Sequence, residues 1–413
     1  MAGWPRPRRP RHHRRPCSAP GRRGTSPSVR GSAHQHVRGR GTAHAGRRAA
    51  RRIRANVARG NTFRLPAGTQ TPATRDGDAV RYHHLPSFTG ADALRVAERD
   101  EPAPGPGQIL VRMRAWSVNH RDLLIASGRY GRGMRANVVP LSDGAGEVVA
   151  TGQGTTRWTT GDRVLSVFMP NWQSGPIDER SAAGALGGPV DGVLAEYVVF
   201  DEDAVVSAPA HLDMPEAATL PCAAVTAWHA LVTHGGLAPG QQVLALGSGG
   251  VSVFAVQLAV AGGARVTVTS GDDRKLERLC GLGAADGVNY RRVPEWGRTI
   301  HGRSGGVDHV LEVGGAGTLR QSLAAVRTGG RVSVIGVLAD GAGISVPHLL
   351  WKAVTVQGLS VGSRAVFEEL NRAIVRHAIH PIVDRVFPFG EAAEAYRHLG
   401  TGKHFGKVVI VAD

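Results

Sequence analysis

From Gln242 onward, short apolar segments alternate with helix-like segments, and this alternation restricts the fold more than any other feature of the chain. The predicted strands are Gln242–Leu246, Arg265–Thr269, Gly287–Tyr290, Val307–Val313, Arg331–Val337 and Ala353–Leu359. The helices predicted between them are Val251–Ala261, Asp273–Leu282 and Thr318–Arg327. Strands that alternate with helices form a parallel sheet covered by helices on both faces. This part of the chain is therefore expected to be a doubly wound α/β domain.

The preceding region has a different rhythm, in which β-type segments follow one another with Gly, Pro and Asp between them. The predicted strands are Gln108–Ser117, Gly144–Thr151, Asp162–Phe168 and Leu194–Phe200. No long helix is expected before Pro215, where the helical segment Pro215–Thr233 begins. Several short strands with turns between them predict a small β-barrel-like domain. After about Phe367 a helix and two strands, Pro381–Phe387 and Gly406–Val411, are expected to return to this first domain.

The N-terminal region carries almost all of the net charge. The chain has 413 residues and a net charge of +17, whereas residues 1–75 contain 19 Arg and no Lys, Asp or Glu. This region alone thus carries +19, which leaves −2 for the rest. It is rich in Pro, Gly, Ser and His and lacks apolar periodicity, so it cannot bury enough surface to offset the entropy of ordering. We expect residues 1–78 to form a disordered basic extension.

Three interpretations of this extension compete. It could bind nucleic acid through phosphates, or it could be an Arg-rich targeting peptide, although no amphipathic helix is visible. It could also be translated from a start site upstream of the true one. The chain has 46 Arg and only 4 Lys, as a GC-rich genome produces, and spurious open frames are common in such genomes. We favour the last interpretation and expect no nucleic-acid partner.

Apolar stretches and cysteines exclude two further classes. No segment approaches the ~20 consecutive apolar residues of a membrane-spanning helix, so no membrane association is expected. Cys17, Cys222 and Cys280 lie far apart, which excludes a disulfide framework and a Cys-rich zinc module. We expect a cytoplasmic protein.

The first strand–helix turn of the α/β region carries a chemical motif. After Gln242–Leu246 the chain reads Gly247-Ser-Gly249-Gly250-Val251-Ser252. A glycine-rich turn leaves backbone N–H groups free to bind a pyrophosphate at the helix N-terminus. Ser252 replaces the third glycine of the usual fingerprint. The turn predicts a dinucleotide site; the alternative is a glycine-rich loop without a cofactor.

The end of the second strand distinguishes NAD from NADP. An acidic residue there would bind the ribose hydroxyls of NAD, but Ser270 occupies the place, 23 residues after Gly247. Arg274 and Lys275 can supply positive charge to a 2′-phosphate, although Asp272 and Asp273 lie beside them. We favour NADP (NADPH) over NAD.

Several segments together resemble the zinc-independent members of the medium-chain dehydrogenase/reductase superfamily, which includes quinone oxidoreductases and alcohol dehydrogenases. They are Asn119-His-Arg-Asp122, Ser142-Asp-Gly-Ala-Gly-Glu147, Gly161-Asp-Arg-Val164, Ala217–Cys222 with Thr226-Ala-Trp228, the glycine turn and His404-Phe-Gly-Lys407. The resemblance implies a GroES-like catalytic domain over 79–209, completed by 367–413, and a Rossmann domain over 210–366.

The resemblance also shows where zinc ligands are missing. Zinc-dependent relatives hold the catalytic metal with a Cys, a His and a second Cys or an acid. Here Asn119 stands at the first place, Ser142-Asp143 at the second, and only Cys222 at the third. One thiol cannot form a catalytic site that takes three protein ligands. No cysteine lies between Asp162 and Gly192, the lobe that would carry structural zinc. We expect no metal site.

The remaining site residues follow from the resemblance. Asn119 and Asp122 are implied at the cleft as catalytic residues; Asp122 could instead only orient the loop, and Arg121 is expected to be an exposed loop residue. The substrate pocket would take His120, Tyr130, Phe168 and Trp172. The implied cofactor contacts, beyond those named above, are Thr226, Tyr290, Gly314, Gly315 and Lys407.

Without metal, a plain carbonyl is hard to polarise, whereas hydride addition to an enone or quinone yields a delocalised enolate. We expect an NADPH-dependent reductase of a small carbonyl-conjugated substrate. A zinc-free NAD(P)-dependent alcohol or aldehyde dehydrogenase and a non-catalytic NADPH-binding protein are the alternatives. A homodimer through the edge strand Val354–Leu359 is also expected.

Overall fold

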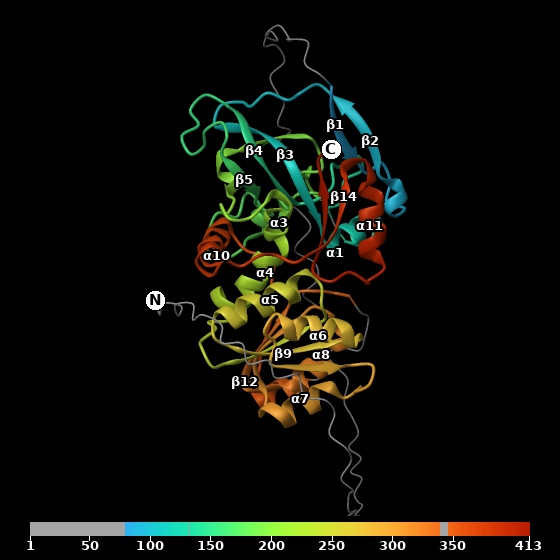
Figure 1. The fold of residues 1–413 in the computed structure, drawn as a ribbon, viewed down its shortest axis with the longest axis vertical. Helices are drawn as coiled ribbons and strands as arrows, with labels where there is room; N and C mark the ends of the chain where they lie inside the picture. Colours follow the sequence, from blue (N-terminus) through green and yellow to red (C-terminus); the bar gives the residue numbers. More distant parts are fainter. Residues whose placement is uncertain (1–78, 132, 339–345) are drawn as a thin grey trace, which may run out of the picture. The chain divides into compact units, whose positions relative to one another are not determined.

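The computed structural model describes residues 79–131, 133–338 and 346–413, and the predictions for residues 1–78 lie outside this range. The described chain forms a mostly β domain, in the upper half of Figure 1, and an α/β domain in the lower half. This is the expected pairing of a GroES-like domain with a Rossmann-like parallel sheet. No helix among the described residues is long and apolar enough to cross a membrane.

The upper domain is built around one long strand. β3 (Gln108–Val118) pairs antiparallel with β4 (Asp143–Thr151), β6 (Tyr197–Asp201) and β15 (Lys407–Val411). Both faces of β3 are covered, so its apolar residues are almost all buried. The other strands of this domain are β1 (Val80–His84), β2 (Arg95–Arg99), β5 (Arg163–Ser166), β7 (Val205–Ser207) and β14 (Val383–Pro388).

The two ends of the chain meet in this sheet. β15 lies between β14 and β3, although about 290 residues separate it from β3 in the sequence. The C-terminal strands β14 and β15 therefore belong to the same sheet as β3. The short helices of this domain are α1 (His120–Ala126), α2 (Glu179–Ala183) and α11 (Ala392–Gly400), and α10 (Arg364–His377) precedes β14.

The lower domain contains six parallel strands in the order β10-β9-β8-β11-β12-β13. Their bounds are Gln242–Leu246 (β8), Arg265–Ser270 (β9), Asp286–Asn289 (β10), Val307–Glu312 (β11), Val326–Val334 (β12) and Thr355–Gly358 (β13). The strand order reverses between β8 and β11, and in such sheets ligands bind at the carboxyl ends beside that reversal.

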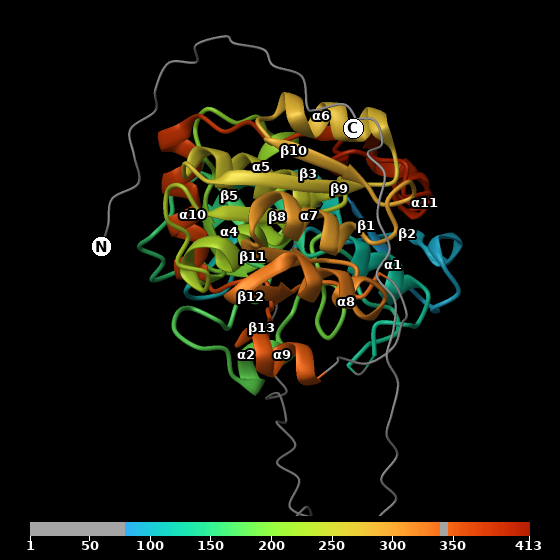
Figure 2. The ribbon, with the colours of Figure 1, turned by 90° about the horizontal axis from the view of Figure 1, so that it is seen from below.

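Helices cover both faces of this sheet. Val243 and Ala245 of β8 belong to the apolar cluster that includes α5 (Gly250–Ala261) and α6 (Asp273–Gly281), whereas Leu244 and Leu246 pack with α7 (Trp296–Ser304) and α8 (Ala316–Ala325). Alternate residues of a strand face opposite sides, so the apolar run of β8 reflects burial on both. Figure 2 shows the sheet between these two helix layers.

Some helices differ from the sequence predictions. α7 and α9 (Val346–Lys352) were not predicted, and β12 begins five residues before the predicted Arg331. The helical segment predicted over Pro215–Thr233 consists of α3 (Met214–Ala217) and α4 (Val225–Trp228), with π-helical turns at Leu220–Ala224 and His229–Thr233. Pro221 lies at the start of the first π-helical turn and has no N–H to donate, which interrupts the backbone hydrogen bonds between α3 and that turn.

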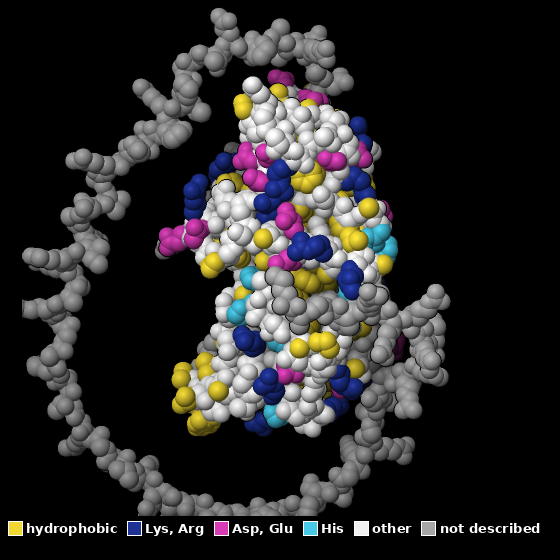
Figure 3. Space-filling view, turned by 90° about the vertical axis from the view of Figure 1, so that its left-hand side faces the viewer, with side chains coloured by type: hydrophobic (Ala, Val, Ile, Leu, Met, Phe, Trp, Pro, Cys, Tyr) yellow, Lys and Arg dark blue, Asp and Glu magenta, His cyan; other side chains and the backbone are white. Residues whose placement is uncertain are grey.

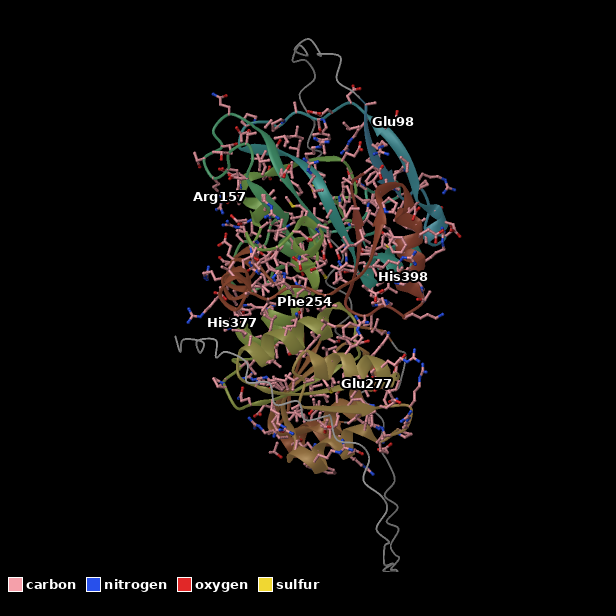
Figure 4. The ribbon with its side chains drawn as sticks, viewed as in Figure 1. Glu98, Arg157, Phe254, Glu277, His377 and His398 are labelled. Atoms are coloured by element: carbon pink, nitrogen blue, oxygen red, sulfur yellow. The ribbon has the colours of Figure 1, made fainter. Side chains whose placement is uncertain are left out.

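Apolar packing joins the two domains. One apolar cluster contains residues of the upper sheet, such as Leu165 and Val409, and residues of the helices α4, α5 and α10. Phe254 of α5 is buried in this cluster and lies at the level where the two halves meet in Figure 4. The candidate site lies along this junction.

Candidate active site

The glycine turn has the conformation that its residues require. Gly247 has a φ of +77°, a region that L side chains rarely adopt. A Cβ added at Gly250 would lie 2.5 Å from Cδ of Lys407, so only glycine leaves room for that side chain. Ser252 is buried in the first turn of α5 and donates to the backbone oxygen of Leu246 at 2.5 Å. The serine thus fastens the helix start to the strand that precedes it.

The C-terminal segment is attached to this turn. The N–H of Gly406 donates to the backbone oxygen of Ser248 at 3.0 Å. Lys275 of α6, predicted to contact the cofactor, donates from Nζ to the backbone oxygens of Gly402 and His404 at 2.9 and 2.8 Å. Its ammonium therefore holds the C-terminal segment against the α/β domain. Val251 occupies the half-buried second position of α5.

Asn119 and Asp122, the two predicted catalytic residues, lie together at the start of α1. Asn119 is 9% exposed and precedes the helix, and Asp122 is fully buried in its first turn. The Asp122 carboxylate accepts from the backbone N–H of Asn119 at 2.7 Å. Because the first N–H groups of a helix lack intrahelical partners, this contact fixes the backbone of Asn119.

Lys407 lies against Asn119 from the other end of the chain. It is 4% exposed, and its Nζ donates to Oδ1 of Asn119 at 2.5 Å and to the backbone oxygen of Val118 at 3.0 Å. A carboxylate oxygen of Asp143 lies 3.8 Å from the same Nζ. Lys407 was predicted to contact the cofactor; its ammonium here lies in the buried cluster beside Asn119.

The three positions aligned with zinc ligands meet around Asp143. Its carboxylate accepts from the hydroxyl of Ser142 at 2.7 Å and from the backbone N–H of Cys222 at 3.2 Å. Burial raises the pKa of the Cys222 thiol well above its usual value, and the nearby Asp143 raises it further. At the first of these positions the Asn119 amide, which is not among the usual zinc ligands, lies beside the ammonium of Lys407.

The buried carboxylates have perturbed acidities. Burial raises the pKa of Asp122 to about 6, although the guanidinium of Arg121 opposes the shift. Burial also raises the pKa of Asp143, and Lys407 is the main group that opposes it. Burial disfavours the charged form of an acid, and a nearby cation restores it.

Arg121 is buried, contrary to the expected exposed loop position. Its guanidinium lies over the rings of Phe168 and Tyr130, with centroid distances of 4.6 and 5.0 Å. Nη1 donates to the backbone oxygen of Leu186 at 2.8 Å and lies 3.5 Å from Asp122. The Asp122 carboxylate and two aromatic faces explain why a charged residue is tolerated there. Two predicted pocket residues thus contact Arg121.

The other predicted site residues are more scattered. Trp172 is buried and donates from Nε1 to the backbone oxygen of Gly175 at 2.9 Å. Thr226 is buried within α4 and donates to the backbone oxygen of Cys222 at 2.6 Å. His120 is exposed at the first position of α1. No hydrogen bond or ring contact described for the structure joins these three to Asn119.

Gly314 and Gly315 follow β11 and are held by a buried carboxylate, Glu312, that no sequence motif indicated. Glu312 accepts from both glycine N–H groups at 2.7 and 2.9 Å and from the hydroxyls of Thr318 and Ser322. A fully buried carboxylate with four donors orders the loop at the carboxyl edge of the sheet.

A pocket of about 420 Å³ lies at the carboxyl ends of β9 and β10. It is lined by Gly271, Asp272, Asp273, Arg274, Asn289, Arg291 and Arg292. Ser270, which precedes the lining residue Gly271, is buried, and Tyr290, between the lining residues Asn289 and Arg291, is 43% exposed. Arg291 and Arg292 directly follow the predicted Tyr290 and were missed, although two consecutive cations after a strand were a visible signal.

The acidic residues of this pocket have partners of their own. Asp272 caps α6 by accepting from the N–H groups of Arg274 and Lys275. Asp273 accepts from Nδ2 of Asn289 at 2.6 Å and pairs with Arg292. Arg274 and Arg291 form no ion pair among the described residues, so their guanidinium groups are available to an anion.

Comparison with known proteins matches both domains. Residues 105–210 match the alcohol dehydrogenase GroES-like domain, and residues 250–376 match the zinc-binding dehydrogenase domain. A zinc-type alcohol dehydrogenase-like protein of Schizosaccharomyces pombe is 40% identical over 347 residues, which cover 81% of this chain and all of that protein. A chloroplastic quinone-oxidoreductase of Triphysaria versicolor is 34% identical over 214 residues, or 50% of this chain and 59% of that protein.

Among solved structures, a putative alcohol dehydrogenase from Sinorhizobium meliloti 1021 has 44% sequence identity and a TM-score of 0.75, and the match covers 80% of this chain and 99% of that chain. Similarity over both domains of a dehydrogenase, at this identity, extends beyond the fold alone. The chain belongs to the medium-chain dehydrogenase/reductase family of alcohol dehydrogenases and quinone oxidoreductases, and it is an NAD(P)-dependent oxidoreductase.

Proposed function

We propose that the protein is a zinc-independent, NADPH-dependent reductase of small carbonyl-conjugated substrates, enones or quinones. The observation that carries this proposal is the Asn119 side chain at the domain junction. Its amide nitrogen Nδ2 is buried and makes no hydrogen bond within the described part of the chain. A buried donor without a partner is costly, and a substrate carbonyl oxygen would satisfy it.

The donors around Asn119 support a reaction without zinc. A lysine ammonium and an amide occupy the cluster in which a zinc-dependent relative would need three anionic or imidazole ligands. No group of three His, Cys, Asp or Glu residues that could hold a metal ion occurs among the residues described. Carbonyl polarisation is therefore assigned to N–H donors of the chain itself.

The proposed substrate class follows from the use of one uncharged hydrogen-bond donor, the Asn119 amide, to stabilise the carbonyl oxygen. When bound, NADPH supplies a hydride to the double-bond carbon farthest from the carbonyl, and a proton from water completes the adjacent carbon. Negative charge develops on the substrate's carbonyl oxygen, where Asn119 Nδ2 would donate. A positioned donor in a buried site stabilises such an oxyanion more than water does. Asp122 holds the Asn119 backbone in place.

NADPH is proposed as the cofactor because of the pocket beside β9. Ser270 presents no fixed negative charge at the end of that strand, and both nearby aspartates are engaged by caps and by Arg292. Arg274 and Arg291 line the pocket without ion-pair partners among the described residues. A 2′-phosphate is a dianion that such guanidinium groups bind well.

The test follows NADPH oxidation by the full-length protein in EDTA, with (E)-2-hexenal or hexanal as substrate and NADH as the alternative cofactor. We expect turnover of 2-hexenal alone, hexanal as its product, and preference for NADPH. Turnover of hexanal, or hexenol as the product, would instead favour the alcohol and aldehyde chemistry for which several relatives are named. If the protein bound the cofactor but turned over neither aldehyde nor a benzoquinone, both the enone or quinone reductase and the alcohol or aldehyde dehydrogenase would be contradicted.

The apolar surface beside the sheet edge supports a homodimer. β13 pairs only with β12 within the described strands, and nearby Leu350 and Trp351 are 75% and 77% exposed. Figure 3 shows a group of hydrophobic side chains at the edge of the lower domain. An unpaired edge strand flanked by apolar surface favours pairing with a second copy. Light scattering should give the dimer mass, and Trp351→Asp should shift it to the monomer; a monomeric wild type would contradict the proposal.

A further inference from the structure

The Lys407 side chain spans two parts of the site. Its backbone begins β15, its stem passes over Gly250 at the N-terminus of α5, and its ammonium reaches the end of β3. A cation at a glycine turn is suited to a phosphate, but here Nζ donates to two protein oxygens instead, on Val118 and Asn119. The side chain therefore ends at the proposed carbonyl donor.

This contact determines which way the Asn119 amide faces. An ammonium group carries only donors, so the atom 2.5 Å from Nζ must be the amide oxygen. The Nδ2 group then points away from Lys407. With the opposite orientation, Nδ2 would face a buried cation, and the donor would be unavailable to substrate.

Asp143 completes the arrangement. Its carboxylate lies 3.8 Å from Nζ, and the ammonium of Lys407 favours the ionised form of this buried acid. The Asn119 amide also interacts with the Asp143 carboxylate and favours its ionised form, although the contact from Nδ2 is too poorly aligned or too long to be a good hydrogen bond. Since the amide has two N–H bonds, a loose contact with Asp143 by one leaves the other for a ligand.

We propose that Lys407 is a positioning residue for the reaction: its ammonium fixes the Asn119 amide with Nδ2 toward the substrate carbonyl and strengthens that N–H as a donor. Withdrawal of electron density from Oδ1 polarises the amide, as in a chain of hydrogen bonds. The inference rests on the proposed function, because it requires Asn119 to contact the substrate.

The experiment is a double-mutant cycle with Lys407→Met and Asn119→Ala in the full-length protein, using NADPH and (E)-2-hexenal. We expect Lys407→Met to lower kcat about tenfold or more, less than the loss of the donor itself. The Kd for NADPH, from nicotinamide fluorescence, should stay within about twofold. In the Asn119→Ala background the second substitution should change kcat little, because the two residues act as a unit.

Lys403→Met is the matched control, since Lys403 is exposed in the same C-terminal segment. If Lys407→Met does not fold, Lys407→Gln, which keeps an uncharged N–H donor, enters the same cycle with the same expected coupling. If the losses in kcat from the two substitutions multiplied in the double variant, Lys407 would act independently of Asn119 and the inference would be overturned. A tenfold weaker binding of NADPH with kcat unchanged would also overturn it and would indicate that Lys407 contacts a phosphate. An unchanged kcat in Asn119→Ala alone would instead refute the proposed carbonyl donor.

Discussion

Replacing Asn119 with Ala should lower kcat for 2-hexenal reduction by about 10²–10³-fold, the usual cost of removing one oxyanion donor. Nδ2 is buried and makes no good hydrogen bond within the described structure, so its hydrogen bond to the substrate would form in a site shielded from water. Because the donor acts most strongly when charge develops on the oxygen, kcat should fall more than KM rises. Steady-state kinetics with saturating NADPH measure both.

Two further variants separate the amide from a general loss of packing. Asn119→Asp keeps the size of the side chain and an oxygen for Lys407 but removes the amide donor, so at neutral pH it should also lose most activity. Asn371→Ala removes an amide of α10 that donates to the Ser207 backbone at 2.9 Å and should leave kcat unchanged. Full activity in Asn119→Ala would remove the basis of the proposed mechanism.

The sequence predicted an element most accurately where the pattern of apolar residues and the neighbouring turn both indicated the same structure. The strand Gln242–Leu246 was predicted with the bounds that β8 has, because an apolar run before a glycine turn has few other solutions. α7 was missed because its sequence, Trp296–Ser304, is mostly polar and shows only Trp296 and Ile300 as large buried residues. The spacing of apolar residues predicts a helix poorly when its buried face contains only two large apolar side chains.

The sequence indicates candidate site residues, but it does not indicate the contacts between them. Motifs identified Asn119 and Asp122, and the structure places both at the start of one helix. The partner of Asn119 could not be found in this way, because Lys407 is 288 residues away and reaches it only through the β3–β15 pairing. Arg121 was expected to be exposed because the sequence does not show which aromatic rings lie beside it. In the structure its guanidinium lies over Phe168, which is distant in the sequence, and near the carboxylate of Asp122.

Cofactor preference provides the second large effect. Replacing both Arg274 and Arg291 with Ala should lower kcat/KM for NADPH about 100-fold and change that for NADH less than about threefold. A charge-assisted hydrogen bond contributes about 1.5–3 kcal/mol, and 1.4 kcal/mol is a factor of ten. Both arginines are exposed, which places each near the lower end of that range. The kinetics should be compared at low ionic strength, where the difference is greatest.

The contrast between the two cofactors is what makes this test decisive. Only NADPH carries the 2′-phosphate, so an equal loss with NADH would mean that the arginines contact a part common to both cofactors. Arg298→Ala removes an exposed arginine of α7 that lies outside the pocket and should alter neither cofactor. A wild-type preference for NADH would contradict the assignment, because Asp272 would then have to leave its cap, or Asp273 its contacts with Asn289 and Arg292, to bind the ribose hydroxyls.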